Sequence, residues 1–374
     1  MIIDDYILEK CIGKGSFGEV YYSTKKDTNE KYATKKLDRQ ELEHTEGLKY
    51  LQNEISILTK INHPNVVKFA DVKKTKKHFY IMMEYCNGGE LSKALDKYQG
   101  QNGHPFTEEI VQYLMRQIVD AVNCIHQMKI IHRDLKLDNI LLHYDNEEDK
   151  KNFNILKAKI KIIDFGFACL ISDTGLKFSV LGSPIYMDPL ILKKLTSHDG
   201  KTRQLGYNQK ADIWSLGALC YEMLVGKTAF ASDDVEELSD KVEQGKYSIP
   251  TNLSREVISF LNGMLQYNSE ERLKAEELLK HPFLTKKICD FSKVLIRRVS
   301  TNVKEDKLNM NTKKLTKSIR LIFNPESEKR KEGEEKIEGF YLSNEIPDNP
   351  VNVNINGSTQ EEIKKEGLGD FVFS

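Results

Sequence analysis

The stretch that decides the fold reads IIHRDLKLDN and covers residues 130–139. Histidine, arginine, lysine, asparagine and two aspartates stand here among apolar residues, a mixture that suits neither a core strand nor an ordinary helix. Polar groups that are buried must find hydrogen-bonding partners. The stretch is therefore either a charged surface loop or a site where several charges converge, and the segments around it decide between these alternatives.

A glycine-rich loop, GKGSFGEV, lies upstream at residues 13–20. Gly13, Gly15 and Gly18 allow a tight turn and a close approach of the backbone to a phosphate. The pattern G-x-G-x-x-G also occurs in dinucleotide-binding βαβ units, where a helix follows the glycines directly. Here the strand-like sequence EVYYSTK follows, so the loop predicts a strand–turn–strand flap over a nucleotide.

Three charged residues follow this loop. Lys35 ends the strand-like YATK, Glu54 lies on a helix expected over residues 46–61, and Asp164 follows the apolar strand IKII. A lone lysine or glutamate is usually a solvated surface charge. A buried lysine, however, needs a carboxylate partner, and the order of glycine loop, strand lysine and helix glutamate favours a phosphate-binding site.

The order of the expected elements divides the chain into two lobes and a tail. Strands are expected over residues 6–37 and a strong helix over 107–127, with Thr107 as its N-cap. The chain thus predicts an α+β fold. The expected parts are an N-lobe at 1–86, a C-lobe at 87–284 and a charged, flexible tail at 285–374.

The composition argues against several classes of protein. Lys and Arg together number 56, as do Asp and Glu, so no nucleic-acid binding driven by overall charge is expected. No apolar run is long enough to span a bilayer, so no transmembrane segment is expected either. The six cysteines are scattered without a C-x-x-C pair, which indicates neither a zinc site nor a disulfide framework. Reduced cysteines favour a cytoplasmic or nuclear location.

Taken together, the motifs resemble those of a eukaryotic protein kinase. G-x-G-x-x-G-x-V, A-x-K, H-R-D-L-x-x-x-N and D-F-G occur in the order of that family, and the combination is highly specific. D-I-W-S-L-G and Arg272 follow, so the resemblance covers residues 13–284, about three-quarters of the chain. It implies a two-lobed protein kinase fold, with a small antiparallel-sheet N-lobe containing one helix and a larger, mainly helical C-lobe.

The resemblance implies a catalytic role for each matching residue. Asp134 accepts the proton of the substrate hydroxyl, and Lys136 stabilises the phosphoryl group during its transfer. Asn139 and Asp164 hold Mg²⁺ against the phosphates of ATP. Such a step needs positioning and neutralisation of charge more than covalent chemistry, which accounts for metal-binding side chains and lysines around one carboxylate.

The resemblance also implies where ATP binds. Lys35 contacts the α- and β-phosphates and pairs with Glu54, while Met83 resembles the gatekeeper. Residues 84–86 resemble the hinge, whose backbone hydrogen-bonds adenine in this family. The implied ATP-binding residues are the glycine loop and its flanks, the apolar residues around the base, the hinge and a position near the ribose: Ile12, Gly13, Lys14, Gly15, Ser16, Phe17, Gly18, Val20, Ala33, Lys35, Met83, Glu84, Cys86, Glu90 and Leu141.

Two residues indicate the kind of substrate. Lys136 in D-L-K and Ser183 in GSPIYM resemble the marks of serine/threonine kinases, so protein substrates with Ser or Thr hydroxyls are expected. Arg133 in this family usually meets a phosphate on the activation loop. The expected site is Ser179, modified by an upstream kinase or by autophosphorylation. The motifs are most similar to autophagy-initiating kinases, followed by the calcium/calmodulin-dependent group.

Two further hypotheses concern specificity and activity. Glu90, Asp138 and Glu222 resemble acidic positions that face arginines upstream of the acceptor in basophilic kinases, although Glu90 can also bind ribose. The alternative to an active enzyme is a catalytically weak kinase-fold scaffold or signalling adaptor. The presence of every residue that phosphoryl transfer needs in this family argues against that alternative.

An insertion departs from the family pattern. Twenty-four residues separate Asn139 from Asp164, more than the family has. The extra residues at 143–158 are mainly polar and charged, which predicts an exposed hairpin extension with no assigned role. A second polar insertion is expected at 196–206.

A substitution is the other departure. Where the family has Ala-Pro-Glu, this chain has Asp188, Pro189 and Leu190. The family's glutamate pairs with a buried arginine that corresponds to Arg272, and removal of one partner from a buried ion pair costs about 3–5 kcal/mol. We expect Arg272 to find another acceptor, either Asp188 or backbone carbonyls, or else to be solvated.

Overall fold

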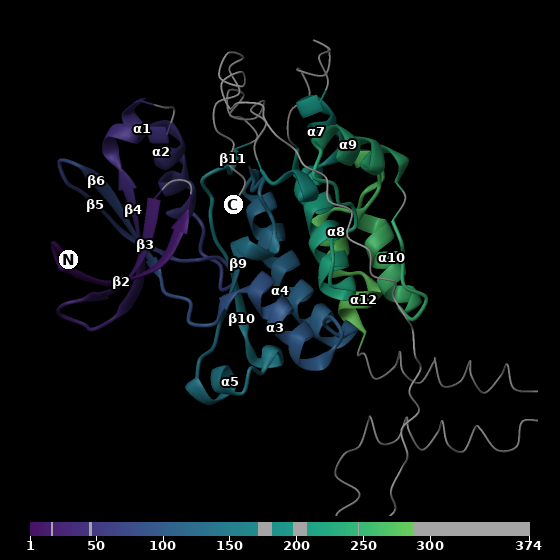
Figure 1. Ribbon diagram of the computed structural model, residues 1–374, viewed down its shortest axis with the longest axis horizontal. Coiled ribbons are helices and arrows are strands. Elements are labelled where there is room, and N and C mark those ends of the chain that lie inside the picture. Colours follow the sequence, from purple (N-terminus) through teal and green to yellow (C-terminus); the bar gives the residue numbers. More distant parts are fainter. Residues whose placement is uncertain (16–17, 45–46, 171–181, 197–207, 246, 287–374) are drawn as a thin grey trace, which may run out of the picture. The chain divides into compact units, whose positions relative to one another are not determined.

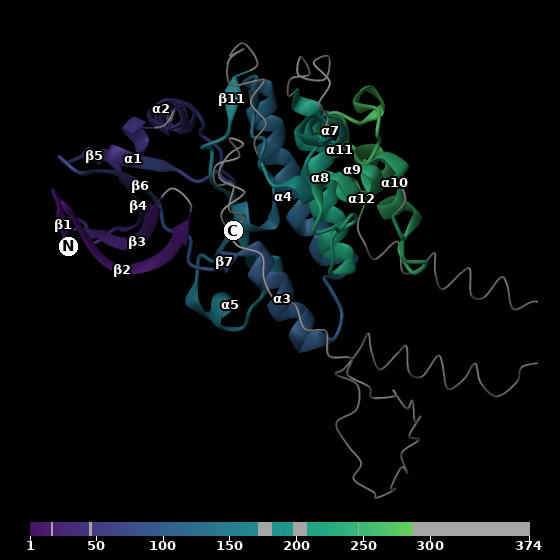
Figure 2. The same ribbon diagram turned by 45° about the horizontal axis from the view of Figure 1, so that its top comes forward.

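The computed structural model describes residues 1–15, 18–44, 47–170, 182–196, 208–245 and 247–286. Its N-lobe is built on an antiparallel sheet in the strand order β1-β2-β3-β4-β6-β5, whose curl is visible in Figure 2. The strands are β1 (Ile2–Ile3), β2 (Tyr6–Gly15), β3 (Gly18–Lys25), β4 (Lys31–Asp38), β5 (Phe69–Lys74) and β6 (His78–Glu84).

Two helices, α1 (Arg39–His44) and α2 (Gly47–Leu58), lie against this sheet (Figure 1). The inner strand β6 is apolar on both faces, because successive side chains of a strand point to opposite sides. Tyr80 and Met82 pack into a cluster with Tyr6, whereas Ile81 packs with Leu51 of α2. This packing holds α2 in place against the sheet that carries Lys35.

Helices dominate the C-lobe. They are α3 (Leu91–Asn102), α4 (Glu108–Gln127), α7 (Pro189–Thr196), α8 (Gln209–Val225), α9 (Val235–Gln244), α10 (Arg255–Met264), α11 (Ala275–Leu279) and α12 (Pro282–Thr285). The predicted helix at 107–127 is confirmed as α4, and the Thr107 side chain accepts a hydrogen bond from the Ile110 amide, 3.4 Å. The expected apolar stripe of α4, including Leu114 and Ile118, is fully buried.

Short strands position the loops of the site. A sheet in the order β10-β9-β7 contains β7 (Gly89–Glu90), β9 (Ile140–His143) and β10 (Lys159–Ile162), and β8 (Ile130–Ile131) pairs with β11 (Cys169–Leu170). The stretch at 130–139 therefore begins in β8 and leads into β9. Asp164 lies two residues after the end of β10.

The predicted hairpin insertion is present, and it is only partly exposed. β9 and β10 pair antiparallel with His143 opposite Lys159, and the connection contains a short helix, α5 (Glu147–Lys151). Tyr144 and Ile155 are nevertheless buried, and the Lys97 ammonium lies 4.2 Å from the ring centroid of Phe153. The predicted exposed hairpin is thus confirmed in its pairing and in most of its residues, while a few of its apolar residues pack onto the C-lobe.

The predicted α+β class with two lobes is confirmed, with local corrections. The run HPNVVKFADV, residues 63–72, predicts a strand, but β5 begins only at Phe69, because the residues before it dock on β10 through the Val67 amide and the Ile162 carbonyl, 2.9 Å. Among the described residues, no helix is both long and apolar enough to cross a membrane. The insertion at 196–206 lies almost wholly outside the described residues, and the domain boundaries stay predictions.

Candidate active site

Lys35 meets two carboxylates from different elements. Its Nζ lies 3.5 Å from Glu54 Oε2 on α2 and 3.8 Å from Asp164 Oδ1 after β10. Burial alone would lower the pKa of the Lys35 ammonium, but the charges of Glu54 and Asp164 outweigh it and raise the pKa. Lys35 therefore stays charged in a setting that disfavours an isolated charge.

The pKa values of the Glu54 and Asp164 carboxyl groups are shifted in opposite directions. Burial raises the pKa of Glu54, Lys35 opposes this and Asp164 adds to it, so the pKa of Glu54 lies above its usual range. Burial acts on Asp164 in the same sense, but Lys35 and then His132 outweigh it and lower the pKa of Asp164. Asp164 is thus the carboxylate of the pair that stays ionised, as a metal ligand must.

The loop at 130–139 is shaped by a carboxylate on α8. Asp212, which is fully buried, accepts hydrogen bonds from the amides of His132 and Arg133, both at 2.9 Å, and its Oδ2 lies 2.8 Å from His126 Nε2. Arg133 adopts φ +71°, a conformation that is rare for residues other than glycine. Asp212 fixes this bend and so positions Asp134.

Asp134 is the meeting point of three predicted residues. Its Oδ1 accepts hydrogen bonds from the amide and the hydroxyl of Ser183, both at 3.0 Å, and its Oδ2 accepts one from Asn139 Nδ2 at 2.8 Å. Lys136 Nζ lies 3.4 Å from Asp134 Oδ2 and donates to Ser183 Oγ at 2.9 Å. The structure thus brings Asp134, Lys136, Asn139 and Ser183 together.

Asn139 and Asp164 have the chemistry that Mg²⁺ requires. Asn139 uses its amide nitrogen on the Asp134 carbonyl and carboxylate, both at 2.8 Å, which leaves its amide oxygen to act as a ligand. Asp164 adopts φ +60° and presents an ionised carboxylate. Mg²⁺ prefers oxygen ligands and usually takes only one or two from the protein, with phosphates and water completing its shell. The residues present fit this ion.

The glycine loop forms the predicted strand–turn–strand hairpin. Gly13 pairs with Val20 and Gly15 with Gly18 across β2 and β3. Gly18 has φ +140°, and a Cβ there would lie 2.0 Å from the Lys36 carbonyl oxygen, so only glycine fits. Ser16 and Phe17 lie outside the described residues.

The other predicted ATP residues follow from the strands. Ala33 lies opposite Met83 in the β4–β6 pair, and Val20 opposite Lys35 in the β3–β4 pair. Val20, Ala33 and Leu141 are half-buried, as the walls of an open cleft would be. Cys86 is buried, and burial together with the charge of Glu84 raises the pKa of its thiol to about 12.

Three of the predicted ATP-binding residues form ion pairs with other side chains of the protein. Lys14 pairs with Glu19 at 3.2 Å, and Glu90 pairs with Lys93 at 2.7 Å. The Glu84 carboxylate contacts Lys161 at 2.7 Å. Ile12 is exposed on β2. The assignment of these residues to ATP stays a prediction, as does the role of Ser179, which lies outside the described residues.

The missing glutamate at position 190 is replaced as predicted. Arg272, only 2 % exposed, forms an ion pair with Asp188 and donates to the carbonyls of Gln266 and Lys210 at 2.7 and 2.8 Å. Asp188 Oδ1 also accepts from the amide of Leu190 at 2.8 Å, at the start of α7. One carboxylate therefore caps a helix and neutralises a buried arginine.

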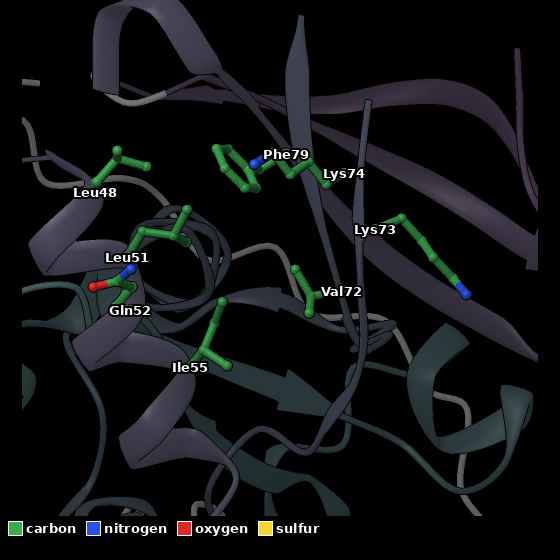
Figure 3. A pocket seen from close by; sticks show the side chains of 8 residues that line it. All are labelled: Leu48, Leu51, Gln52, Ile55, Val72, Lys73, Lys74 and Phe79. Carbon is green, nitrogen blue, oxygen red and sulfur yellow. The ribbon is translucent and has the colours of Figure 1, made fainter. Parts of the chain in front are cut away.

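Two hollows lie away from Lys35 and Asp134, although the predicted ATP-binding residues Ile12 and Glu84 line one of them. Figure 3 shows the smaller, about 210 Å³, in which Leu51 and Ile55 of α2 face Val72 and Phe79 of the sheet. The larger, about 1050 Å³, runs behind the hinge and is lined by residues that include Glu84, Asn87 and His143. Neither is lined by Lys35, Asp134 or Asp164.

Comparison with known proteins agrees with this geometry. The protein kinase domain family matches residues 6–284. The chain is 36 % identical over 290 residues to the serine/threonine-protein kinase atg1 of Dictyostelium discoideum, covering 75 % of this chain and 39 % of that protein. It is 33 % identical over 307 residues to the serine/threonine-protein kinase ATG1 of Debaryomyces hansenii, covering 75 % and 34 %.

A plant relative extends the comparison. The chain is 34 % identical over 307 residues to the serine/threonine-protein kinase AtPK2/AtPK19 of Arabidopsis thaliana, covering 81 % of this chain and 59 % of that protein. The matched part thus spans between about a third and three-fifths of the length of these relatives. The predicted resemblance to serine/threonine kinases, including the autophagy-initiating group, is confirmed. The chain belongs to the protein kinase domain family, among its serine/threonine kinases.

Proposed function

We propose that the protein transfers the γ-phosphoryl group of ATP to serine and threonine hydroxyls of protein substrates, with Mg²⁺ as the metal. The observation that carries this proposal is the convergence of Lys136, Asn139 and Ser183 on the Asp134 carboxylate. A scaffold would not need to gather an acceptor carboxylate, a cation and an amide at one point.

The contacts of Asp134 suggest how the hydroxyl is received. Ser183 and Asn139 hold the carboxylate at 3.0 and 2.8 Å, whereas Lys136 is looser at 3.4 Å. The substrate hydroxyl binds near Asp134 Oδ2, where the contact with Lys136 is the longest of those described. It passes its proton to Asp134 as its oxygen attacks the γ-phosphorus. Lys136 then neutralises the charge on the transferred group.

The nucleotide is held from two sides. Lys35 is kept charged and oriented between Glu54 and Asp164, in reach of the phosphates. Asn139 and Asp164 are the residues that would hold Mg²⁺. When bound, the ion neutralises phosphate charge and aligns the transferred group.

A phosphotransfer assay tests the proposal. The wild-type protein with ATP and Mg²⁺ is expected to phosphorylate a serine/threonine peptide library, and Asp134→Asn is expected to lower the rate by about 10²–10⁴-fold, the usual contribution of a general base. Asp145→Asn, which alters an exposed carboxylate paired with Lys159, is the matched control. A folded wild-type protein without transfer would favour the kinase-fold scaffold.

The proposal extends to basic residues upstream of the acceptor. Burial, with the added charge of Asp138, raises the pKa of Glu222, although the Tyr186 hydroxyl donates to it at 2.5 Å. Because the charges of Glu222 and Asp138 repel each other, a cationic side chain of the substrate would be attracted to this pair. A library without arginine or lysine enrichment at positions −3 and −2 would remove this part of the proposal.

Regulation and location complete the proposal. We infer that phosphorylation of Ser179, by an upstream kinase or in cis, raises activity, as Arg133 beside Asp134 suggests for this family. Full activity of Ser179→Ala after treatment with ATP would contradict this. The scattered cysteines support a cytoplasmic or nuclear location, which microscopy of a tagged protein would check.

A further inference from the structure

The hinge is fastened to the β9–β10 hairpin at both of its ends. At one end, the Glu84 carboxylate binds Lys161 of β10. At the other end, the Asn87 side chain binds the backbone of Tyr144, the first residue of the insertion after β9. We call these two contacts the hinge clamp.

The first contact is a partly buried ion pair, since the Lys161 side chain is 11 % exposed and that of Glu84 27 %. Lys161 Nζ lies 2.7 Å from Glu84 Oε1 and 2.8 Å from Oε2, so both carboxylate oxygens are engaged. Within the described residues, Glu84 is the acid that Lys161 contacts. Lys159, on the same strand, instead pairs with Asp145 at the surface.

The second contact is a reciprocal pair of hydrogen bonds. Asn87 Nδ2 donates to the Tyr144 carbonyl at 3.0 Å, and the Tyr144 amide donates to Asn87 Oδ1 at 2.8 Å. The next residue continues the connection, since the Gly88 amide donates to the Leu142 carbonyl at 2.8 Å. The hinge is therefore fixed to the base of the insertion.

The same hairpin carries two parts of the nucleotide site. Leu141 lies on β9 directly opposite Lys161 of β10, so both side chains leave the hairpin on the same face. β10 ends two residues before Asp164. It is also bonded to the segment after α2, through Asn65 and Val67 on either side of Ile162.

Stability alone gives a weak account of this partly buried ion pair. Replacement of a buried ion pair by apolar side chains is often neutral or even stabilising, because desolvation offsets the attraction between the charges. What such a pair does supply is a fixed geometry between two elements. Here the two elements are the hinge and the strand that leads to Asp164.

We propose that Lys161 and Asn87 are positioning residues for the nucleotide. They fix the position of the hinge backbone relative to Leu141 on β9. The adenine-binding groups and the metal-binding Asp164 can then contact one ATP molecule at the same time. The insertion then has a role: its base is one of the two anchors of the hinge. This inference rests on the proposed function, since it assumes that the hinge binds ATP.

The first test separates nucleotide affinity from catalysis. Lys161→Met is expected to raise the Kd for ADP, measured by calorimetry, and the KM for ATP by about tenfold, as loss of one charged contact would. The kcat at saturating ATP and the KM for the peptide are expected to stay within about twofold. Lys161→Arg is expected to restore most of the affinity. Lys159→Met, which breaks the exposed pair on the same strand, is the matched control.

The second test uses the other anchor. Asn87→Ala is expected to raise the Kd for ADP by about threefold to fivefold, the worth of a hydrogen bond, and to speed amide exchange at Glu84 and Gly88. Asn146→Ala is the control, because Asn146 caps α5 through the Asp149 amide and does not reach the hinge. If Lys161→Met does not fold, Asn87→Ala and Lys161→Arg still decide the question.

The outcomes are distinct. Unchanged nucleotide affinity and unchanged hinge exchange in folded Asn87→Ala and Lys161→Met proteins would overturn the proposal, as would equal losses in the controls. If the wild type binds ADP but transfers no phosphate, the proposed function fails while the affinity measurements still judge the clamp. If the wild type binds no nucleotide at all, both proposals fall.

Discussion

Lys35 in the cleft and Arg272 in the C-lobe are both buried cations held by carboxylates, and they are held very differently. Arg272 forms an ion pair with Asp188, donates to three backbone carbonyls and has Trp214 5.1 Å away beneath its guanidinium. Lys35 contacts Glu54 and Asp164 only at 3.5 and 3.8 Å, longer than ordinary hydrogen bonds.

The difference separates a cation that supports the fold from one that awaits a ligand. Arg272 has its hydrogen-bonding capacity engaged by the protein, so it has little left for a substrate. Lys35 is kept charged, yet its contacts to Glu54 and Asp164 at 3.5 and 3.8 Å are loose enough to admit a closer acceptor. A phosphate oxygen can take that place at little cost in broken contacts.

The largest expected effect is on stability, from Arg272→Met. Removal of the guanidinium leaves the Asp188 carboxylate buried without its cation, which is expected to cost about 3–5 kcal/mol of unfolding free energy. Urea unfolding followed by fluorescence measures this. The rate of phosphotransfer per folded molecule is expected to change little. A destabilisation below about 1 kcal/mol would mean that Arg272 is not the structural cation described here.

Lys35→Met is expected to lower the rate of phosphotransfer and to leave stability nearly unchanged, the opposite of Arg272→Met. Loss of the ammonium removes a charge aimed at the phosphates, so the rate of phosphotransfer is expected to fall by about 10²–10³-fold. The melting temperature is expected to change little, because Glu54, whose pKa is already raised by burial, can take up a proton. Lys36→Met, at a neighbour that pairs with Glu19, is the control. Comparable losses in both variants would erase the distinction.

A smaller loss of stability is expected when the Asp188 carboxylate, the partner of Arg272, is removed. Asp188→Ala removes both the ionic partner of Arg272 and the acceptor for the Leu190 amide. The expected cost is about 2–3 kcal/mol, less than for Arg272→Met, because Arg272 keeps its three backbone carbonyl acceptors. Addition of Leu190→Glu is expected to recover about half of that loss, since it places an acid where the family has its glutamate. No recovery in the double variant would show that the backbone here accommodates only the Asp188 arrangement.

The smallest expected effect is a dependence on pH. The pKa of Glu54 is raised, so it takes up a proton at a higher pH than an exposed glutamate and then no longer holds Lys35 electrostatically. Since the folded state binds this proton more tightly, the stability that Glu54 contributes is present at low pH and is lost as pH rises through its folded pKa.

The rate profile checks this. On going from pH 7 towards pH 5, kcat/KM is expected to fall by about threefold or more through Glu54, and Glu54→Gln is expected to lack this part of the fall. Arg272 contributes no such fall to the pH profile of kcat/KM, because a guanidinium does not lose its proton in proteins. An identical acid limb in Glu54→Gln would assign the titration to another group.

Motifs with fixed spacing were predictable, and contacts between distant segments were not. The gathering of Lys136, Asn139 and Ser183 around Asp134 was implied by the resemblance of the motifs to those of protein kinases. Asp212 was quoted only as part of a motif, because its bonds to the loop join residues about 80 positions apart in sequence. An acid within an otherwise apolar helix was the one available signal.

The missed elements have similar causes. α1 and α5 have six and five residues, too few to show a helical period. Lys161 was overlooked because a lysine in a strand usually indicates the face exposed to water. Its burial depends on Glu84, which approaches from another sheet. Asp188 could be named as one acceptor for Arg272, but only the fold shows that it also caps α7.

The buried Cys86 in the hinge has a consequence for inhibitor chemistry. Cysteines beside a nucleotide cleft invite electrophilic compounds, but the thiolate is the form that reacts. With the pKa of the Cys86 thiol at about 12, a fraction on the order of 10⁻⁵ is ionised at neutral pH. Acrylamide-type warheads directed at this thiol are therefore expected to bind reversibly for long periods before any covalent bond forms, and intact-mass spectrometry would follow that slow adduct.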